Sequence, residues 1–433
     1  MKGGEYKMPD IDEKIQYYHG YKFRIYPTDS QKEFIRSNIN AARYVYNWAI
    51  EQEENQYQLY LQGKVGKNEK FMELTQLHKL FVIYRHMPGN EWLLTVPLAT
   101  CREAMKNAIQ AYKNWFSKRS KHPKFKSKKT AKQVYQTRHD RMRIIGETLR
   151  IEGLPFRSRL DFDTVKIDKR ITKFNLDNLK VYHTSISRDN LDNYYVSFCI
   201  IKDKPLSYFE DNNIPKMDRA IGIDLNFRKD ARVVCSDGTR FIAPDISKEE
   251  KKIKRLSRKC GKDRRRQKEL ERANPDIVIE PSKRSIKRRL EYRKYNKRIH
   301  DKNVTFACTV AKRIVDKNPL AVVLEDLKGQ EIMSVRWVAK YVQNNPLCII
   351  KDRIKSKCNM YNVPVIIASK DYPSTQMCSN SGHIKKMYSS KTYICHNCGM
   401  RMDRDDNAAL NLERLAYNYD FTHMSNINLA NIG

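Results

Sequence analysis

Long apolar runs are missing from this 433-residue sequence. No stretch reaches the length of about 18 residues that a membrane-spanning helix needs, and the polar leader over residues 1–19 lacks the apolar core of a secretory signal. We therefore expect no membrane partner and a cytoplasmic location. Internal repeats of fixed period are also missing, which argues against a repeat architecture.

Clustered cysteines are scarce. Seven of the ten cysteines stand singly in apolar or basic surroundings, which favours reduced thiols over a disulfide framework. The exceptions are Cys378, Cys395 and Cys398.

Acidic residues are outnumbered, because 84 Lys and Arg face 50 Asp and Glu and leave a net charge of +34. Self-repulsion at that charge makes a nucleic acid the expected partner. The contents of 40% hydrophobic and 10% aromatic residues exclude a disordered basic tail. The length accommodates about two to four domains.

The amino-terminal half predicts strands interrupted by helices. We expect a strand over residues 21–26, a turn at Pro27 and a helix capped by Thr28 or Ser30. Helical spacing continues to residue 116, and β-type runs cover residues 165–169, 179–188 and 193–200. We therefore expect a β-barrel over residues 20–30 and 117–204, a helical insertion over residues 31–116, and a linker over residues 205–218.

The carboxy-terminal half predicts an α/β domain over residues 219–372 and 402–418. A buried strand ending in GIDLN precedes a hairpin with an Asp237-Gly238 turn. Further strands lie in LAVVLEDLKG and PVIIAS, and helices lie over residues 334–360 and 403–416. Residues 373–401 interrupt this domain and residues 419–433 form a tail.

The most basic stretch covers residues 251–302, within an expected insertion over residues 248–302. It holds 22 Lys or Arg against 7 Asp or Glu. Pro275 and Pro281 split it into two helices, and the second continues to residue 315. A solvated helix face is the ordinary explanation of such a run, but like charges at this density destabilise a helix, which favours contact with a nucleic-acid backbone.

Candidate chemistry lies in Asp224, Glu325 and one acid among Asp403, Asp405 and Asp406. The first two directly follow buried β runs, so parallel strands would bring both carboxylates to one edge of a sheet. Three converging carboxylates can hold two Mg²⁺ about 4 Å apart, which suits phosphodiester hydrolysis. The alternative is structural, because an acid after a strand can cap a turn and Asp405 or Asp406 can cap a helix.

Three motifs together resemble a known family. GIDLN with its hairpin, VVLEDLKG and DRDDNAALNL are similar to the three RuvC motifs of transposon-encoded TnpB nucleases and of the related miniature type V-F CRISPR effectors. YKFRIYPTDSQKEF, AARYVYNWAIE, HPKFKSKK and DYPSTQMCSNSGH also match, so the resemblance covers about residues 20–418. In this family the last catalytic acid is the Asp of D-x-N-A-A, which selects Asp405.

The resemblance implies a multidomain fold. Its parts are an amino-terminal β-barrel (wedge) with a helical (recognition) insertion and an RNase H-like RuvC domain with an inserted zinc-ribbon-like target-binding module. It implies an Mg²⁺-dependent DNA endonuclease in which Asp224, Glu325 and Asp405 hold two ions. The expected partners are a guide RNA and double- and single-stranded target DNA, bound by a monomer or a homodimer on one RNA in the prokaryotic cytoplasm and at the nucleoid during targeting.

Two alternatives from other classes stay open. The first is a guide-directed regulator that occupies DNA without cutting it, against which the three intact acids argue. The second is a transposase that joins DNA ends with the same acids.

The cysteine cluster resembles a zinc ribbon with one ligand missing. Cys395 and Cys398 form one knuckle, but the upstream knuckle runs from Cys378 to Ser381, a hydroxyl in place of a thiolate. His383 could supply the fourth Zn²⁺ ligand, as could His396 with some distortion. The alternative is a ribbon held by backbone hydrogen bonds without metal.

Further residues are candidates for nucleic-acid contact. In the amino-terminal half, Gln and Arg side chains could read a short flanking motif and Tyr could stack on a base, although exposed polar residues are the ordinary explanation of each. The basic segments would grip the backbone. The full set is Arg102, Lys106, Lys124, Lys126, Tyr135, Gln136, Thr137, Arg264, Arg265, Arg266, Arg288 and Arg289.

Overall fold

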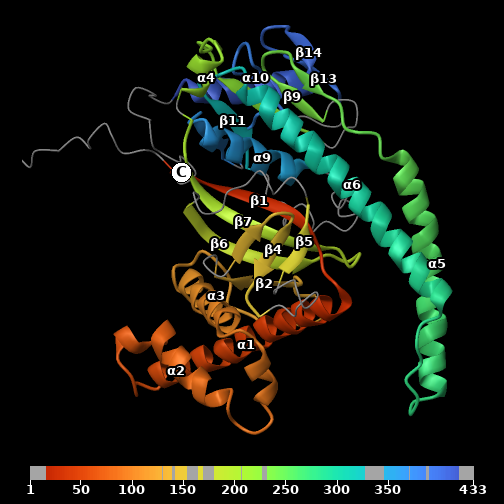
Figure 1. Ribbon diagram of the computed structural model, residues 1–433. Coiled ribbons are helices and arrows are strands. Elements are labelled where there is room, and N and C mark those ends of the chain that lie inside the picture. The colour runs from red at the N-terminus through yellow and green to blue at the C-terminus, as the bar shows by residue number, and fades with distance from the viewer. Residues whose placement is uncertain are drawn as a thin grey trace, which may run out of the picture. The chain divides into compact units, whose positions relative to one another are not determined.

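The computed structural model describes residues 16–128, 130–138, 142–153, 164–168, 180–205, 207–226, 232–326, 346–369, 371–386 and 390–418. The chain divides into two compact units, one of residues 18–202 and one of residues 1–17 and 203–433 (Figure 1). Most of the polar leader, the tail and the start of the helix expected near residue 334 lie outside the described residues. No described helix is both long enough and apolar enough to cross a membrane.

Helices make up the first part of the unit of residues 18–202. They are α1 (Asp29–Leu61), η1 (Lys67–Glu69), α2 (Leu74–Tyr84), η2 (Glu91–Thr95) and α3 (Leu98–Phe116). Helix α1 begins where predicted, because Thr28 caps it and the Gln31 side chain accepts a hydrogen bond from the Thr28 N–H, which completes a capping box. Tyr46 and Trp48 of α1 are buried in the core between α1, α2 and α3.

A seven-stranded sheet forms the rest of this unit, in the order β2-β6-β7-β1-β5-β4-β3. Alternation along β7 buries Tyr194, Val196, Phe198 and Ile200 on one face. The all-β character is as predicted, whereas closure into a barrel stays a prediction. The strands are β1 (Gln16–Tyr26), β2 (Val134–Thr137), β3 (Met142–Ile145), β4 (Thr148–Ile151), β5 (Thr164–Ile167), β6 (Lys180–Arg188) and β7 (Tyr194–Asp203).

The second unit is α/β. Its five-stranded sheet has the order β10-β9-β8-β11-β12, in which β8, β9 and β10 form the predicted antiparallel meander and β8, β11 and β12 run parallel. The strands are β8 (Ile221–Leu225), β9 (Val233–Cys235), β10 (Arg240–Phe241), β11 (Val322–Glu325) and β12 (Val365–Ala368). A separate antiparallel pair, β13 (Thr392–Ile394) and β14 (Arg401–Asp403), lies at the carboxy-terminal end of the expected zinc ribbon over residues 373–401.

Helices cover both faces of this sheet. Alternate strand residues such as Ile223 and Leu324 join a core with α6 (Lys283–Val315) and α9 (Leu347–Met360). The residues between them, such as Val323, pack on the opposite face with α10 (Arg404–Ala416). Helix α5 (Ser247–Ala273) packs along α6, which confirms the two basic helices predicted from the prolines between them.

The segment expected to be a linker is partly folded onto this unit. It contains a one-turn helix, α4 (Tyr208–Asp211), and Phe209 and Met217 pack against the core that α6 and α9 share with the sheet. Tyr208 also contacts the Tyr361 ring, at 4.1 Å between centroids. Its apolar residues, rather than its Pro and Asn content, therefore decide how this segment is packed.

Candidate active site

Asp224 and Glu325 lie on neighbouring parallel strands. Ile223 of β8 pairs with Leu324 of β11, so the next residues, Asp224 and Glu325, stand side by side at the same edge of the sheet. This is the arrangement expected from an acid after each buried β run.

Asp405 reaches the same place from the first turn of α10. Gly222 packs directly on the backbone of Ala409 and Glu413 of that helix. Asp224 lies two residues beyond Gly222 on the same face of β8, a step of about 6.7 Å. Asp405 lies one helical turn before Ala409, and the step of about 5.4 Å from Ala409 to Asp405 runs the same way as the step from Gly222 to Asp224. The two carboxylates therefore meet at one end of the contact between β8 and α10.

The group that we call the acid edge (Asp224, Glu325 and Asp405) is dominated by like charges, and Arg404, 3.3 Å from Asp405, offsets them in part. Asp224 is 4% exposed and Asp405 is 1% exposed. Burial, and then the charges of Glu325 and Asp405, raise the pKa of Asp224 to about 8, although the Asn226 hydrogen bond acts in the opposite direction. A bound cation would relieve both causes.

The acid edge fits hard divalent cations by its chemistry, because its ligand atoms are carboxylate oxygens. Among the described residues, the one group of three or more ligating side chains whose ligand atoms all lie within 4.8 Å of one another is the cysteine group. The acids are therefore spaced more widely than a single small ion requires. Two ions about 4 Å apart would span such a group better than one.

Neighbouring side chains explain why other nearby acids do not belong to this group. Asp403 is the N-cap of α10 and accepts a hydrogen bond from the Asp405 N–H at 2.8 Å, so the cap is neither Asp405 nor Asp406. Asp406 pairs with Arg240 at 2.5 Å, and Asp326 pairs with Lys351 at 2.9 Å.

Three residues that contact the acids were not predicted as site residues. Asn226 donates to Asp224 at 2.7 Å, Ser374 donates to Glu325 at 2.6 Å, and Arg404 lies 3.3 Å from Asp405. Asn226 and Arg404 stand within the quoted motifs GIDLN and DRDDNAALNL, and Ser374 stands in DYPSTQMCSNSGH. Their membership of these motifs was the available signal.

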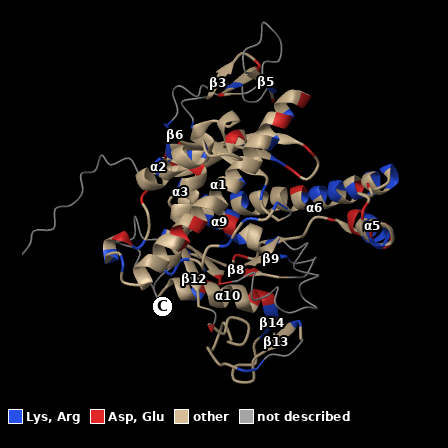
Figure 2. Cartoon of the chain, turned by 90° about the horizontal axis from the view of Figure 1, so that it is seen from below, with Lys and Arg blue, Asp and Glu red and all other residues tan. Residues whose placement is uncertain are grey.

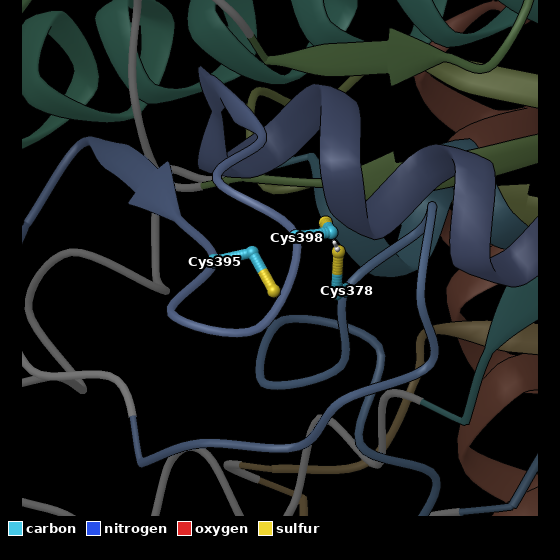
Figure 3. A group of neighbouring side chains, drawn as sticks. All are labelled: Cys378, Cys395 and Cys398. Carbon is cyan, nitrogen blue, oxygen red and sulfur yellow. Dashed lines mark hydrogen bonds between the residues drawn. The ribbon is translucent and has the colours of Figure 1, made fainter.

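The cysteine cluster (Cys378, Cys395 and Cys398) brings three sulfur atoms within 4.8 Å of one another (Figure 3). Ser381 occupies the corner that a fourth ligand would take, because its Oγ lies 3.4 Å from the Cys395 Sγ and its N–H donates to the Cys378 Sγ. The Ser381 hydrogen bond is the largest cause that lowers the pKa of Cys395, to about 6. Thiolates at this spacing fit a soft or borderline ion such as Zn²⁺.

The structure does not bring His383 into this cluster. Its side chain is exposed, its carbonyl accepts a hydrogen bond from the Cys378 N–H, and its ring is not among the grouped ligand atoms. His396 is likewise exposed and outside the group. The described geometry therefore offers three thiolates and a hydroxyl.

Comparisons with known proteins match several parts of this chain. Residues 349–412 match the family model of the Cas12f1-like TNB domain, and residues 18–62 match a helix-turn-helix domain model. A relative from Streptomyces pristinaespiralis, named "Putative RNA-guided DNA endonuclease", is 24% identical over 90% of this chain and 88% of its own length. The TnpB-like protein L79 of Acanthamoeba polyphaga mimivirus is 27% identical over 46% of this chain and 38% of its own length. The chain is therefore similar to TnpB-like proteins.

The two regions that match family models correspond to particular helices and strands of the structure. Residues 18–62 form most of β1 and all of α1, a strand and one long helix rather than two helices. Residues 349–412 run from α9 through the cysteine cluster into α10 and include Asp405. Among solved structures, Cas12f1 in its complex with sgRNA and target DNA is 13% identical, with a TM-score of 0.48 over 89% of this chain and 83% of that chain.

Lys and Arg residues are concentrated along α5 and the adjoining part of α6 (Figure 2). Arg264, Arg265 and Arg266 are exposed, as a backbone-binding role requires. Arg288 instead pairs with Asp263 at 2.6 Å and braces α6 against α5. Arg289 is half-buried on α6.

The candidates in the amino-terminal unit divide by exposure. Arg102, Lys106, Lys124 and Lys126 are exposed, whereas Tyr135 and Thr137 are only 3% and 6% exposed. The Tyr135 ring belongs to the sheet core, so its burial argues against stacking on a base, and that of Thr137 argues against direct readout. Strand β2 points these two residues inward and Gln136 outward.

Gln136 lines two cavities of this unit, of about 530 and 760 Å³. Lys106 lines the larger one. Asn107 also lines both and donates to the Gln136 side chain at 2.8 Å. The structure therefore brings Lys106 and Gln136 to one cavity and leaves Arg102 outside its lining.

Proposed function

We propose that this chain is an RNA-guided DNA endonuclease that binds a guide RNA, recognises a short flanking motif on target DNA and hydrolyses DNA phosphodiesters. The observation that carries the proposal is the meeting of Asp224, Glu325 and Asp405 at one edge of a parallel sheet. The named activity of the Streptomyces pristinaespiralis relative, which aligns over most of both chains, supports it.

The acid edge would hold two Mg²⁺, and Asp224, Glu325 and Asp405 are the proposed ligands. Two such ions would activate a water molecule and stabilise the leaving oxygen of the phosphodiester. The protein's own part is to hold the carboxylates in place. Asn226 and Ser374 orient two of them by hydrogen bonds, and the α10 backbone positions the third.

The basic surface would hold the nucleic acids. The exposed arginines of α5 (Arg264, Arg265 and Arg266) are placed to grip the backbone of a guide RNA or of the guide–target heteroduplex, which is recognised by shape and charge rather than by sequence. Lys106 and Gln136 at their shared cavity are the better placed of the residues proposed to contact the flanking motif. Target DNA would be met in both double-stranded and single-stranded form.

The cysteine cluster would hold one Zn²⁺ through Cys378, Cys395 and Cys398. The proposed module around it, residues 373–401, is a zinc ribbon that contacts the target strand. The mixed sheet of β8 to β12 with helices on both faces is the part that we propose to be RNase H-like.

Cleavage by single-residue variants tests the proposal. Asp224→Ala and Asp405→Asn are expected to slow Mg²⁺-dependent cleavage of guided target DNA by about 1,000-fold or more while guide RNA stays bound. Asp406→Asn is the matched control, because Asp406 is the next residue in α10 but pairs with Arg240.

Three outcomes are informative. Full cleavage by Asp224→Ala contradicts the site assignment. Guided DNA binding by the parent chain without any cleavage favours a regulator, and joining of DNA ends without RNA favours a transposase.

A further inference from the structure

One short segment touches both groups of metal-ligating side chains. The Ser374 hydroxyl donates to the Glu325 Oε1 at 2.6 Å, and Ser374 is 4% exposed. Four residues later the same segment supplies Cys378, the fully buried member of the cysteine cluster. Residues 374–379 therefore connect the acid edge to the cysteine cluster.

Two buried asparagines of α10 hold this segment in place. Asn411 donates to the carbonyls of Ser374 at 2.7 Å and Met377 at 2.6 Å. Asn407 donates to the carbonyl of Met377 at 2.7 Å and accepts from the Ser379 N–H at 2.9 Å. We call Asn407 and Asn411 the amide clamp. They lie four residues apart and so share one face of the helix.

The amide clamp links the segment to the third acid. Asp405 precedes Asn407 by two residues in the first turn of α10, and the same helix packs on β8 beneath Gly222. Helix α10 thus holds Asp405 directly and Glu325 indirectly, through the backbone of residues 374–377 and the Ser374 hydroxyl.

We propose that Ser374 is a positioning residue for Glu325, and that the amide clamp sets its position from α10. The proposal rests on the proposed function, in which Glu325 is a metal ligand. A Glu side chain has three rotatable bonds, and a donor fixed on one oxygen selects one orientation and leaves the other oxygen for an ion. Hydrogen-bonding partners of this kind commonly determine how tightly a carboxylate holds its metal.

A purely structural role would have another signature. If Ser374 only satisfied a half-buried carboxylate, its loss would lower the stability of the fold and would leave ion binding by the remaining folded molecules unchanged. If it positions Glu325, its loss weakens ion binding in a chain that stays folded.

The experiment uses the full chain and measures Mn²⁺ binding by electron paramagnetic resonance and the Mg²⁺ concentration for half-maximal guided cleavage. Ser374→Ala is expected to raise both the Mn²⁺ dissociation constant and that Mg²⁺ concentration by about tenfold. Ser374→Thr retains the hydroxyl and should lie within about twofold of the parent chain. Thr375→Ala, at the neighbouring hydroxyl, is the matched control.

The clamp is tested by a double-variant cycle. Asn411→Ala should weaken Mn²⁺ binding. The double variant of Asn411→Ala and Ser374→Ala should bind Mn²⁺ no more weakly than the weaker-binding of the two single variants, because both substitutions break the same linkage between α10 and Glu325. If Asn411→Ala does not fold, the comparison of Ser374→Ala with Ser374→Thr alone decides whether Ser374 positions Glu325.

The proposal is overturned if Ser374→Ala binds Mn²⁺ as the parent does, or if Ser374→Thr is as weak as Ser374→Ala. Mn²⁺ binding does not require cleavage. A parent chain that binds Mn²⁺ but never cuts guided DNA therefore contradicts the proposed function, while the Mn²⁺ affinities of the Ser374 variants still decide the role of Ser374.

Discussion

The acid edge and the cysteine cluster gather ligating side chains in different ways. The acids come from two paired strands and a packed helix, so backbone pairing and helix packing fix their spacing. The cysteines come from two tight turns of the ribbon, where Gly382 and Gly399 adopt positive φ angles. The acid edge has every carboxylate that the family motif requires, whereas the cysteine cluster has a hydroxyl in place of one thiolate.

The two sites depend on different features of the chain. The acid edge depends on long-range packing, so a change far from any carboxylate can damage it. The cysteine cluster depends on the identity of each ligand, because a metal in a small ribbon supplies much of the folding energy.

Among changes outside the two groups of ligating side chains, the largest expected effect comes from Gly222→Ala. A methyl group there would overlap the backbone of Ala409 and Glu413, so α10 must move away from β8. We expect destabilisation by about 3 kcal/mol. A displacement of Asp405 by about 1 Å should also slow cleavage by about 100-fold. Thermal unfolding and cleavage rates check both effects.

Gly261→Ala is the matched control, since nothing lies within 4 Å of an added methyl group on that residue of α5. It should be neutral or slightly stabilising. Zinc binding by Gly222→Ala should stay near that of the parent chain, because Asn407 and Asn411 bond the segment of Cys378 to α10, so this segment should move together with the helix. Parent-like cleavage by Gly222→Ala would show that the acid edge does not depend on this packing.

A smaller effect is expected from completing the cysteine cluster. Ser381→Cys places a fourth sulfur where the hydroxyl lies 3.4 Å from the Cys395 Sγ. Zn²⁺ should bind more tightly by about tenfold or more, because a thiolate is a far better ligand than a hydroxyl. Competition with a chromophoric chelator measures the affinity.

The Co²⁺ absorption spectrum gives an independent check, since a fourth thiolate strengthens the sulfur-to-metal charge-transfer band. Cys398→Ser is the opposite variant and should abolish tight binding, and His383→Ala should have no effect. If His383→Ala loses Zn²⁺ and Ser381→Cys gains nothing, the histidine is the fourth ligand.

Comparing Asp224 with a buried carboxylate that has no acidic neighbour shows how much burial alone raises a pKa. Glu53 of α1 is fully buried, and it accepts a hydrogen bond from the Met72 N–H at 3.0 Å. Burial raises the pKa of Glu53 from 4.5 to about 7, with no second acid among the causes. Asp224 differs in that two neighbouring acids add to its burial.

The prediction that leaves both sites untouched follows from this raised pKa. As the pH rises from about 4.5 to 7, the unfolded chain loses the proton before the folded chain does, so stability falls across that window and levels off above it. Glu53→Gln removes this dependence, which amounts to at most about 3 kcal/mol between pH 5 and pH 8. Thermal unfolding followed by tryptophan fluorescence reports on this unit through Trp48, Trp92 and Trp115.

Glu51→Gln, at an exposed position of the same helix, is the control and should retain the pH dependence of the parent chain. An identical pH profile for the parent and Glu53→Gln would mean that this carboxylate is not held in its buried environment.

Much of the acid edge could be predicted from the sequence because its signals are local. A buried β run followed by an acid predicted both Asp224 and Glu325, and the motif around Asp405 placed it at a helix start. The sequence could not show that Asp403 takes the cap, since three acids in four residues are equally suited to it. Ser374 was also beyond prediction as a partner of Glu325, because a contact between residues 49 positions apart depends on tertiary packing.

The inward-facing residues of β2 illustrate another limit. The sequence VYQT alternates, but the alternation alone does not say whether Tyr135 and Thr137 or Val134 and Gln136 face the core. The pairing of Tyr135 with Ile186 on β6 places the tyrosine in the core. The polar Thr137 faces the same way and is buried, and its carbonyl accepts a hydrogen bond from the buried Thr184 hydroxyl.

The parallel pairing of β8 with β11 has a consequence for the order of synthesis. Parallel neighbours cannot be joined by a tight turn, and here the chain passes through α5 and α6 between them. Asp405 then follows Asp224 by 405 − 224 = 181 residues. The basic helices therefore leave the ribosome before the last acid does, so a nascent chain has its most basic surface before it has a complete acid edge.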